Sequence, residues 1–251
     1  MFRSSTNFNQ QFCPFMRALA NSSGITEMSP APKLPTAKNI PDLISNIEGL
    51  KRHSFLCVFL LEPSLSPDDR KLRAWLLHTA ASASRHYSKA RELVVLQDNS
   101  DQVRDGGAIF HILDVSEQIE DCITTTYRAC MAIRRLSNLP EALLFAANHQ
   151  KSLEDLRSIR NQFDHMHTQI TSGEVGNGPI SISFSDEGKS IQFRRLSMET
   201  ADLRDLIEGA YKVVASLYPS FNINSPKEAG GPMKLSISAS ITVTDANGNI
   251  K

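Results

Sequence analysis

The sequence predicts a mainly α-helical protein, in which an antiparallel helical bundle carries a small antiparallel β-sheet near the carboxyl end. Apolar residues recur at steps of three and four over most of residues 39–218, which is the period of helices that bury one face. Between residues 180 and 195 the period changes to two, which is typical of a β-hairpin. The expected connections between helices are short, and short connections favour antiparallel neighbours.

The two ends of the chain differ in composition from the helical domain expected over residues 39–218. Residues 1–38 are rich in Ser, Asn and Pro, which predicts a poorly ordered, disordered amino-terminal arm. Residues 219–251 are expected to form a loop and then a strand at 233–244, where apolar and small polar residues alternate. A single strand needs a partner, so we expect a sheet made of the hairpin plus this terminal strand.

Two helices are expected in the first hundred residues. Asn39 is a candidate N-cap, and Pro41 suits the first turn of a helix that continues to about Leu61. The run Ser66-Pro67-Asp68-Asp69 combines an N-cap, a proline at the first helical position and acidic residues in the first turn. It predicts the start of a second helix that continues to about Leu96.

A third, long helix is expected because its apolar and small residues alternate at steps of three and four. These positions are Ile109, Ile112, Ser116, Ile119, Ile123, Thr126, Cys130 and Ile133. A short helix is expected over 141–147 and a longer one over 148–170. After the hairpin at 180–195, Ser197 is a candidate cap for a last helix over 198–218.

The charge and cysteine content disfavour several classes of function. Lys and Arg number 27, and Asp and Glu number 27, so the chain lacks the general attraction for nucleic acid of a basic protein. The cysteines include no CxxC pair and no Cys/His spacing typical of zinc, so no metal and no other cofactor is expected. Cys57, Cys122 and Cys130 lie in apolar helical contexts, which predicts reduced, buried thiols in a cytoplasmic protein. No apolar run is long enough to span a membrane.

The strongest chemical signal is the run Arg160-Asn161-Gln162-Phe163-Asp164-His165. Arg supplies a permanent positive charge for a phosphate, and His can donate or accept a proton near neutral pH. The helical period predicts a core face made of Leu153, Leu156, Ile159, Phe163, Met166 and Ile170. Asn161 and His165 fall together on the opposite face, and Arg160 lies between the two faces, within reach of His165. His167 falls about half a turn away from His165, which disfavours a metal site formed by both rings.

The motif and its helical setting resemble the HEPN superfamily, whose name abbreviates "higher eukaryotes and prokaryotes nucleotide-binding". Its domains are helical bundles whose signature is an Arg, four to six residues and then a His, with a polar residue often directly after the Arg. Arg160, Asn161 and His165 match this signature residue by residue. The helix around residues 110–114 also looks like the partner helix of such bundles, and the resemblance covers about residues 40–218.

The resemblance implies a metal-independent endoribonuclease of a toxin–antitoxin or other defence system, with RNA as substrate and an antitoxin-like protein as partner. His165 would act as general acid or base, Arg160 would hold the phosphate, and Asn161 would orient the phosphate or the imidazole. The RNA 2′-hydroxyl would attack the phosphodiester and leave a 2′,3′-cyclic phosphate and a 5′-hydroxyl. Members commonly join two motifs across a dimer, so a homodimer through the motif face is expected.

Two other interpretations stay open beside the nuclease. Some members of the superfamily are non-catalytic, and the chain would then be a helical dimerisation, RNA-binding or interaction module. The plainest interpretation is a solvated helix face with an Arg160–Asp164 ion pair, which stabilises a helix by roughly 0.2–0.5 kcal/mol. Outside the motif, Trp75 is expected in the core. Arg134 and Arg135 are expected to stabilise the carboxyl end of the third helix, because cations there interact favourably with the helix dipole.

Overall fold

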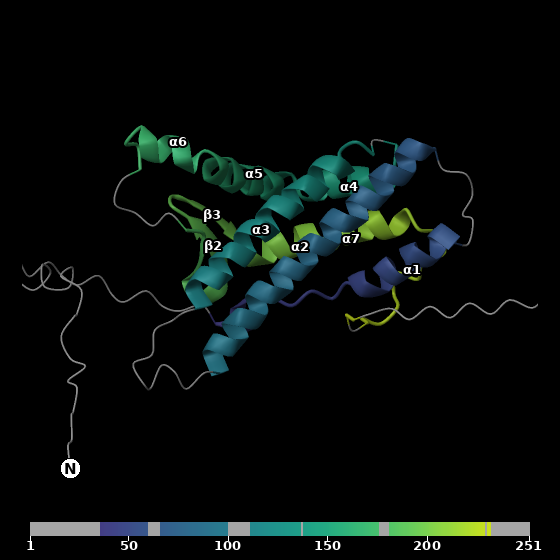
Figure 1. The fold of residues 1–251 in the computed structure, drawn as a ribbon, viewed down its shortest axis with the longest axis horizontal. Helices are drawn as coiled ribbons and strands as arrows, with labels where there is room; N and C mark the ends of the chain where they lie inside the picture. Colours follow the sequence, from purple (N-terminus) through teal and green to yellow (C-terminus); the bar gives the residue numbers. More distant parts are fainter. Residues whose placement is uncertain are drawn as a thin grey trace, which may run out of the picture. The chain divides into compact units, whose positions relative to one another are not determined.

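Two long antiparallel helices and the shorter helices packed on them make up most of the computed structural model. The structure describes residues 36–59, 66–99, 111–136, 138–175, 181–228 and 230–231, all within one unit of contacts at 34–251. The elements in chain order are η3 (Ala37–Asn39), α1 (Ile47–Phe59), α2 (Pro67–Asn99), α3 (His111–Ile133), α4 (Pro140–Asn148), α5 (Gln150–Asp164), α6 (Met166–Thr171), β1 (Ser183–Ser185), η5 (Asp186–Gly188), β2 (Ser190–Phe193), β3 (Leu196–Glu199) and α7 (Thr200–Ser216). The prediction of a mainly helical protein with a small antiparallel sheet towards the carboxyl end is confirmed (Figure 1).

The long helices α2 and α3 lie side by side and supply much of the core (Figure 1). On α3, the predicted positions from Ser116 to Ile133 are all buried, which confirms the alternation of three and four. The predicted start of α2 is confirmed as well, because the backbone N–H of Asp69 donates to Oγ of Ser66 at 3.1 Å. The short helix expected over 141–147 is α4.

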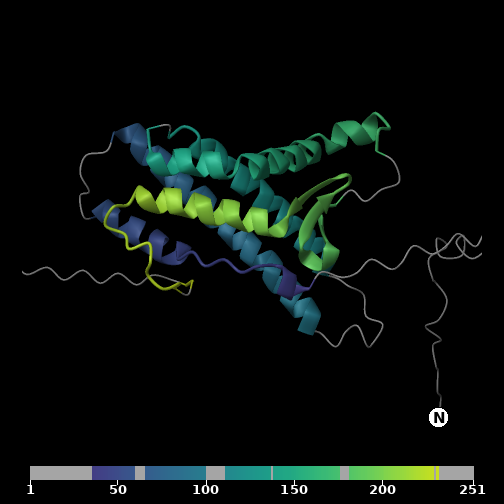
Figure 2. The ribbon, with the colours of Figure 1, turned by 180° about the vertical axis from the view of Figure 1, so that it is seen from behind.

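The first predicted helix is wrong at its start, because α1 begins at Ile47 and not at Asn39. Residues 40–46 are extended and run from the sheet towards α1 (Figure 2). Within this segment Ile40 and Leu43 are buried, so an extended chain places both of them in the core. Asn39 ends the short helix η3, and its side chain donates to the carbonyl of Glu187 at 3.0 Å.

Side chains from two helices satisfy the backbone of the extended segment. Oη of Tyr87 on α2 donates to the carbonyl of Pro41 at 2.8 Å. The buried carboxylate of Glu208 on α7 accepts the backbone N–H of Ile44 at 2.6 Å and that of Ser45 at 3.1 Å. Buried backbone groups must find partners, and these bonds supply what a helix would have supplied internally.

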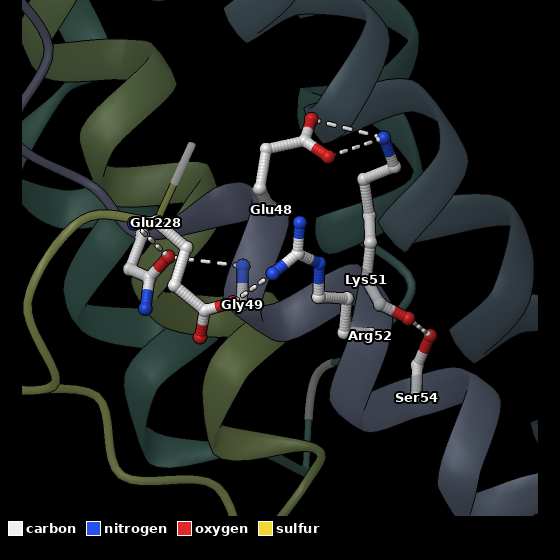
Figure 3. Close-up of polar contacts among 7 residues, drawn as sticks. Glu48, Gly49, Lys51, Arg52, Ser54 and Glu228 are labelled. Carbon is white, nitrogen blue, oxygen red and sulfur yellow. Dashed lines mark hydrogen bonds and ion pairs between the residues drawn. The ribbon is translucent and has the colours of Figure 1, made fainter. Parts of the chain in front are cut away.

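Asn46 caps α1 and ties it to a loop that follows α7. Its Oδ1 accepts the backbone N–H of Gly49 at 2.9 Å and that of Glu228 at 3.0 Å. Nη1 of Arg52 reaches the Glu228 carboxylate at 2.8 Å on the same side of α1 (Figure 3). A Cβ on Gly49 would lie 2.7 Å from Oδ1 of Asn46, so glycine is required there while the cap is formed.

The sheet is antiparallel throughout and has the order β1-β2-β3. Phe184 pairs with Ile191, and Ile191 pairs with Met198, so three buried side chains lie in one row across the sheet. The described part of the hairpin predicted at 180–195 is therefore confirmed. The strand predicted at 233–244 lies outside the described residues, as does the predicted arm apart from residues 36–38.

The third strand, β3, was not predicted, and it replaces the expected start of the last helix. Ser197 does not cap that helix, because it pairs with Gln192 inside the sheet. The turn before β3 uses Arg194 in a left-handed conformation, with φ of 56°. The helix α7 begins at Thr200, whose buried hydroxyl donates to the carbonyl of Gly188 at 2.8 Å. Within the described residues, no helix is both long and apolar enough to cross a bilayer.

Candidate functional site

The motif lies at the end of α5, where a single residue separates this helix from α6. One continuous helix over 148–170 was expected, and that prediction is wrong, because α5 ends at Asp164 and α6 begins at Met166. Between them His165 has φ of −93° and ψ of 4°, away from the helical values. Its N–H still bonds to the carbonyl of Asn161 at 3.1 Å, as in an α-helix. The chain therefore bends at His165, but the helical hydrogen bond at this residue is kept.

The bend falls between two residues of the expected core face, Phe163 and Met166. The ring of Phe163 packs on Phe193 of the sheet, with the ring centres 5.5 Å apart. Ile170 was expected on the core face, but 50% of its surface is exposed, so that part of the prediction is wrong. The side chain of Arg194 donates to Oε1 of Gln169 at 2.8 Å. Met166, at the start of α6, is buried in the core as predicted, and the bond from Arg194 adds a second tie between α6 and the turn before β3.

Arg160 is held by three neighbours. Its Nη2 forms an ion pair with Asp164, and its Nη1 donates to Oδ1 of Asn161 at 3.2 Å. Its guanidinium carbon lies 5.2 Å from the centre of the Tyr127 ring, a distance at which a cation is attracted to the ring face. Within the described residues, the buried Nε of Arg160 has no hydrogen-bond partner. The ion pair of the plainest interpretation is therefore present, and part of the guanidinium still lacks a hydrogen bond.

The structure brings Arg160 and Asn161 together and leaves His165 apart. His165 is exposed, and among the described residues its ring has no hydrogen bond and no ion pair. Asn161 is half-buried and accepts the bond from Arg160. Nε2 of His167 lies 3.1 Å from Oγ1 of Thr168 and takes no part in the motif.

The surface beside Asp164 is acidic. Burial raises the pKa of Glu120 on α3, and the negative charges of Asp121, Glu117 and Asp164 raise it further. Asp164 of α5 and three carboxylates of α3 are therefore close enough to interact. A phosphate that approached Arg160 from this side would be repelled.

On its other side, Arg160 lines a groove between α2, α3 and α5. The groove has a volume of about 350 Å³, at the lower end of typical ligand pockets, and is lined by Leu72, Trp75, Tyr127, Arg128, Met131, Ala132, Arg135 and Arg160. Three of these residues are arginines, and none of the described residues that line the groove is acidic. Arg128 and Arg135 are exposed, and their side chains pair with no carboxylate in the described part of the chain.

Trp75 forms an aromatic wall of this groove. It was expected in the core, but 48% of its surface is exposed, so the expectation is wrong. Leu76 takes the buried position on α2, which leaves the indole at the edge of the helix interface. The indole stacks on the ring of His78, with the centres 6.0 Å apart. An exposed aromatic ring beside arginines can stack on a base while the guanidinium groups bind phosphate.

The sequence contained a weak signal for this groove. Arg128 and Arg135 are seven residues apart with Met131 between them, which is the spacing of residues on one side of a helix. In the structure Arg135 lies in the turn directly after α3. Nothing in the sequence indicated that Trp75 of α2 would lie beside that surface, because the pairing of α2 with α3 decides it.

The described residues contain little support for thiol or metal chemistry. Burial raises the pKa of the Cys122 and Cys130 thiols to about 12, so neither is a thiolate near neutral pH. Cys57, Cys122 and Cys130 are buried, as the sequence predicted. In the part of the chain that the structure describes, no group of three or more His, Cys, Asp or Glu residues could hold a metal ion.

Comparison with known proteins identifies no relative of this chain. No protein-family model, no curated protein and no solved structure matches it. The resemblance to the HEPN superfamily rests on Arg160, Asn161 and His165 and stays a prediction.

Proposed function

We propose that the chain is a helical RNA-binding module, and that single-stranded RNA lies in the groove between α2, α3 and α5. The observation that carries the proposal is the lining of this groove, where exposed Trp75 lies beside Arg128, Arg135 and Arg160. This is the non-catalytic interpretation of the motif, with Arg160 as its binding residue. In this assignment Arg160 contributes through the groove and not through contact with His165.

The groove supplies the two interactions that single-stranded RNA needs. A base stacked on the Trp75 indole contributes about 1–3 kcal/mol, and this contribution depends little on sequence. Guanidinium groups match phosphate with two parallel hydrogen bonds. Arg128 and Arg135 break no described ion pair when they bind phosphate. Arg160 is already ordered over Tyr127, so it loses less conformational freedom on binding.

The attraction for RNA is local, because the whole chain has no net charge. Three arginine–phosphate contacts on a single strand give a slope of about −2 for the logarithm of affinity against the logarithm of salt concentration. A slope near zero would mean that the arginines do not neutralise phosphate. A much steeper slope would mean that RNA covers more of the surface than this groove.

Trp75 provides a direct test, because it is the only tryptophan of the chain. Oligouridylate added to the full chain should quench the tryptophan fluorescence to saturation. An Arg128→Glu/Arg135→Glu double variant should bind at least about tenfold more weakly, since two attractive contacts become repulsive. Arg157→Glu is the matched control, because Arg157 is exposed on α5 and does not line the groove. Equal affinity of the double variant and this control would refute the proposal.

Endoribonuclease activity is a second candidate, and the exposure of His165 at the end of α5 favours it. The ring is open to a phosphodiester or to a second copy of the chain, but it has no contact with Arg160 of its own chain. Two copies joined through the motif face would enclose both histidines together with both arginines. The 2′-hydroxyl would then attack the phosphorus, His165 would move the proton, and the 5′-oxygen would leave.

Cleavage is tested separately from binding. The full chain is incubated with a chelator and a single-stranded RNA or the matching DNA, and the RNA products are analysed for a 2′,3′-cyclic phosphate. The nuclease candidate requires cleavage of RNA only, lost in His165→Ala while affinity for RNA stays unchanged. If the unmodified chain binds RNA without cleaving it, the nuclease candidate is excluded and the proposal of an RNA-binding module stands.

A further inference from the structure

A larger groove lies along another side of α2, between α1 and the first half of α2. Its volume is about 680 Å³, and Tyr218, just after α7, also lines it. The floor is apolar and consists of short or buried side chains of α2, namely Ala74, Leu77 and Ala81. Trp75 and Arg160 do not line it, so this groove is separate from the proposed RNA site.

The groove is positively charged. Five cationic side chains line it, which are Lys51, Arg70, Lys71, Arg73 and Arg85. Among the described lining residues Glu48 is the one carboxylate, so the charges sum to four positive units. Both oxygens of Glu48 already bond to Nζ of Lys51 at 2.9 Å (Figure 3). Lys71 is likewise paired, with Asp68 at 3.3 Å. A negative ligand would therefore interact mainly with the other cationic side chains of the groove.

The positive charges lie at both ends of the apolar floor. Arg70 and Arg85 are fifteen residues apart on one helix, which corresponds to about 22 Å. Both are exposed, and neither pairs with a carboxylate of the described residues. Arg85 donates to Oγ of Ser82 at 3.3 Å. A small anion would reach the arginine at one end of this floor and would leave the charge of the other arginine without a partner.

The positively charged part of the surface along α2 ends next to Arg85. A neighbouring hollow shares Glu48 and Arg85, but Glu92 and Glu228 also line it. Its charge is therefore mixed rather than positive. The continuous cationic part of this side of α2 is limited to the length between Arg70 and Arg85.

We propose that the α1–α2 groove docks an acidic amphipathic helix of a partner protein. A helix of about four turns matches the distance between Arg70 and Arg85. Its apolar face would lie on Leu77, and the short side chains of Ala74 and Ala81 allow a close approach. Acidic residues beside that face would meet Arg70 at one end and Arg85 at the other.

The test uses the full chain and two synthetic helical peptides of about 16 residues. Both carry leucines on one face. One has glutamates beside that face, and the other has lysines at the same positions. The acidic peptide should bind at least about tenfold more tightly than the lysine peptide, because the groove attracts one and repels the other. Affinities are measured by anisotropy of labelled peptides.

Charge reversal in the protein identifies the site. Arg70→Glu/Arg85→Glu should weaken the acidic peptide at least about tenfold and strengthen the lysine peptide. Both positions are exposed, so the variant should keep the helical circular dichroism of the unmodified chain. Arg128→Glu is the control, because it lines only the proposed RNA groove and should leave peptide binding unchanged.

Three outcomes would overturn this proposal. The two peptides could bind equally, or the double variant could bind the acidic peptide as tightly as the unmodified chain does. The third outcome is that oligouridylate, or vesicles of phosphatidylglycerol and phosphatidylcholine, bind through Arg70 and Arg85 while the acidic peptide fails to compete. The groove would then be a nucleic-acid or membrane site.

Discussion

The two sides of Arg160 offer opposite environments to an anion. On one side the guanidinium pairs with Asp164, and the pKa of nearby Glu120 is raised by burial and by neighbouring carboxylates. On the other side it lines a groove with exposed Trp75 and two further arginines. The same side chain therefore belongs to an acidic surface and to a basic, aromatic one.

This difference shows why a short motif does not locate a binding site. Asn161 and His165 both follow Arg160 in sequence, yet of these two residues Asn161 bonds to it and His165 does not. The residues that share the groove with it come from other helices. Each experiment below changes one side of Arg160 and leaves the other intact.

Removal of the aromatic wall should have the largest effect. Trp75→Ala should weaken single-stranded RNA binding by roughly 5- to 150-fold, because one stacked base contributes about 1–3 kcal/mol. Anisotropy of a labelled oligouridylate measures this without the tryptophan signal. Trp75→Phe is the control and should keep most of the affinity, since phenylalanine still offers a ring face. If Trp75→Ala binds as tightly as the unmodified chain, the groove is not the stacking site.

Loss of one groove arginine should have a smaller effect. Arg135→Gln should weaken RNA binding a few-fold and reduce the salt slope by about 0.7, the contribution of one phosphate contact on a single strand. A salt titration of the same anisotropy assay measures both quantities. An unchanged slope would place Arg135 away from the RNA backbone.

Removal of a negative charge on the acidic side of Arg160 should increase the affinity for RNA, whereas the two changes above decrease it. Asp164→Asn should strengthen RNA binding by up to about fivefold, because it removes a repulsive charge and an exposed pair of this kind is worth about 0.2–1 kcal/mol. The side chain keeps its size, so helix packing should not change. A loss of affinity would mean that Asp164 is needed to orient Arg160 towards phosphate.

The smallest effect is expected on stability. The pKa of Glu120 is raised in the folded chain, so the stability that depends on its protonation is present in acid and lost as pH rises through the raised pKa. Glu120→Gln should therefore stabilise the chain at neutral pH by less than about 1 kcal/mol, because solvent screens a half-exposed group. Urea unfolding at neutral pH and near pH ~4 measures the gain, which should shrink in acid. A gain that is equal at both pH values would not come from this ionisation.

Local signals in the sequence predicted several elements correctly because they act within a few residues. Ser66 and Asp69 form a cap over one turn, and the spacing on α3 identifies its buried face without reference to a partner. The start of α1 was wrong for the opposite reason. Glu208 lies far from Ile44 in sequence and yet binds its backbone, so a distant residue selects the extended conformation.

The candidate site divides in the same way. The residue types at Arg160, Asn161 and His165, their helical setting and the mainly helical class of the surrounding domain were predicted from the sequence alone. The spacing of four residues also predicted the Arg160–Asp164 ion pair, which is present. Only the tertiary structure decided that Arg160 bonds to Asn161, that the chain bends at His165, and that Trp75 lies beside Arg160. Periodicity fixes which face of a helix is apolar, whereas the packing of α2, α3 and α5 determines which polar side chains share a groove.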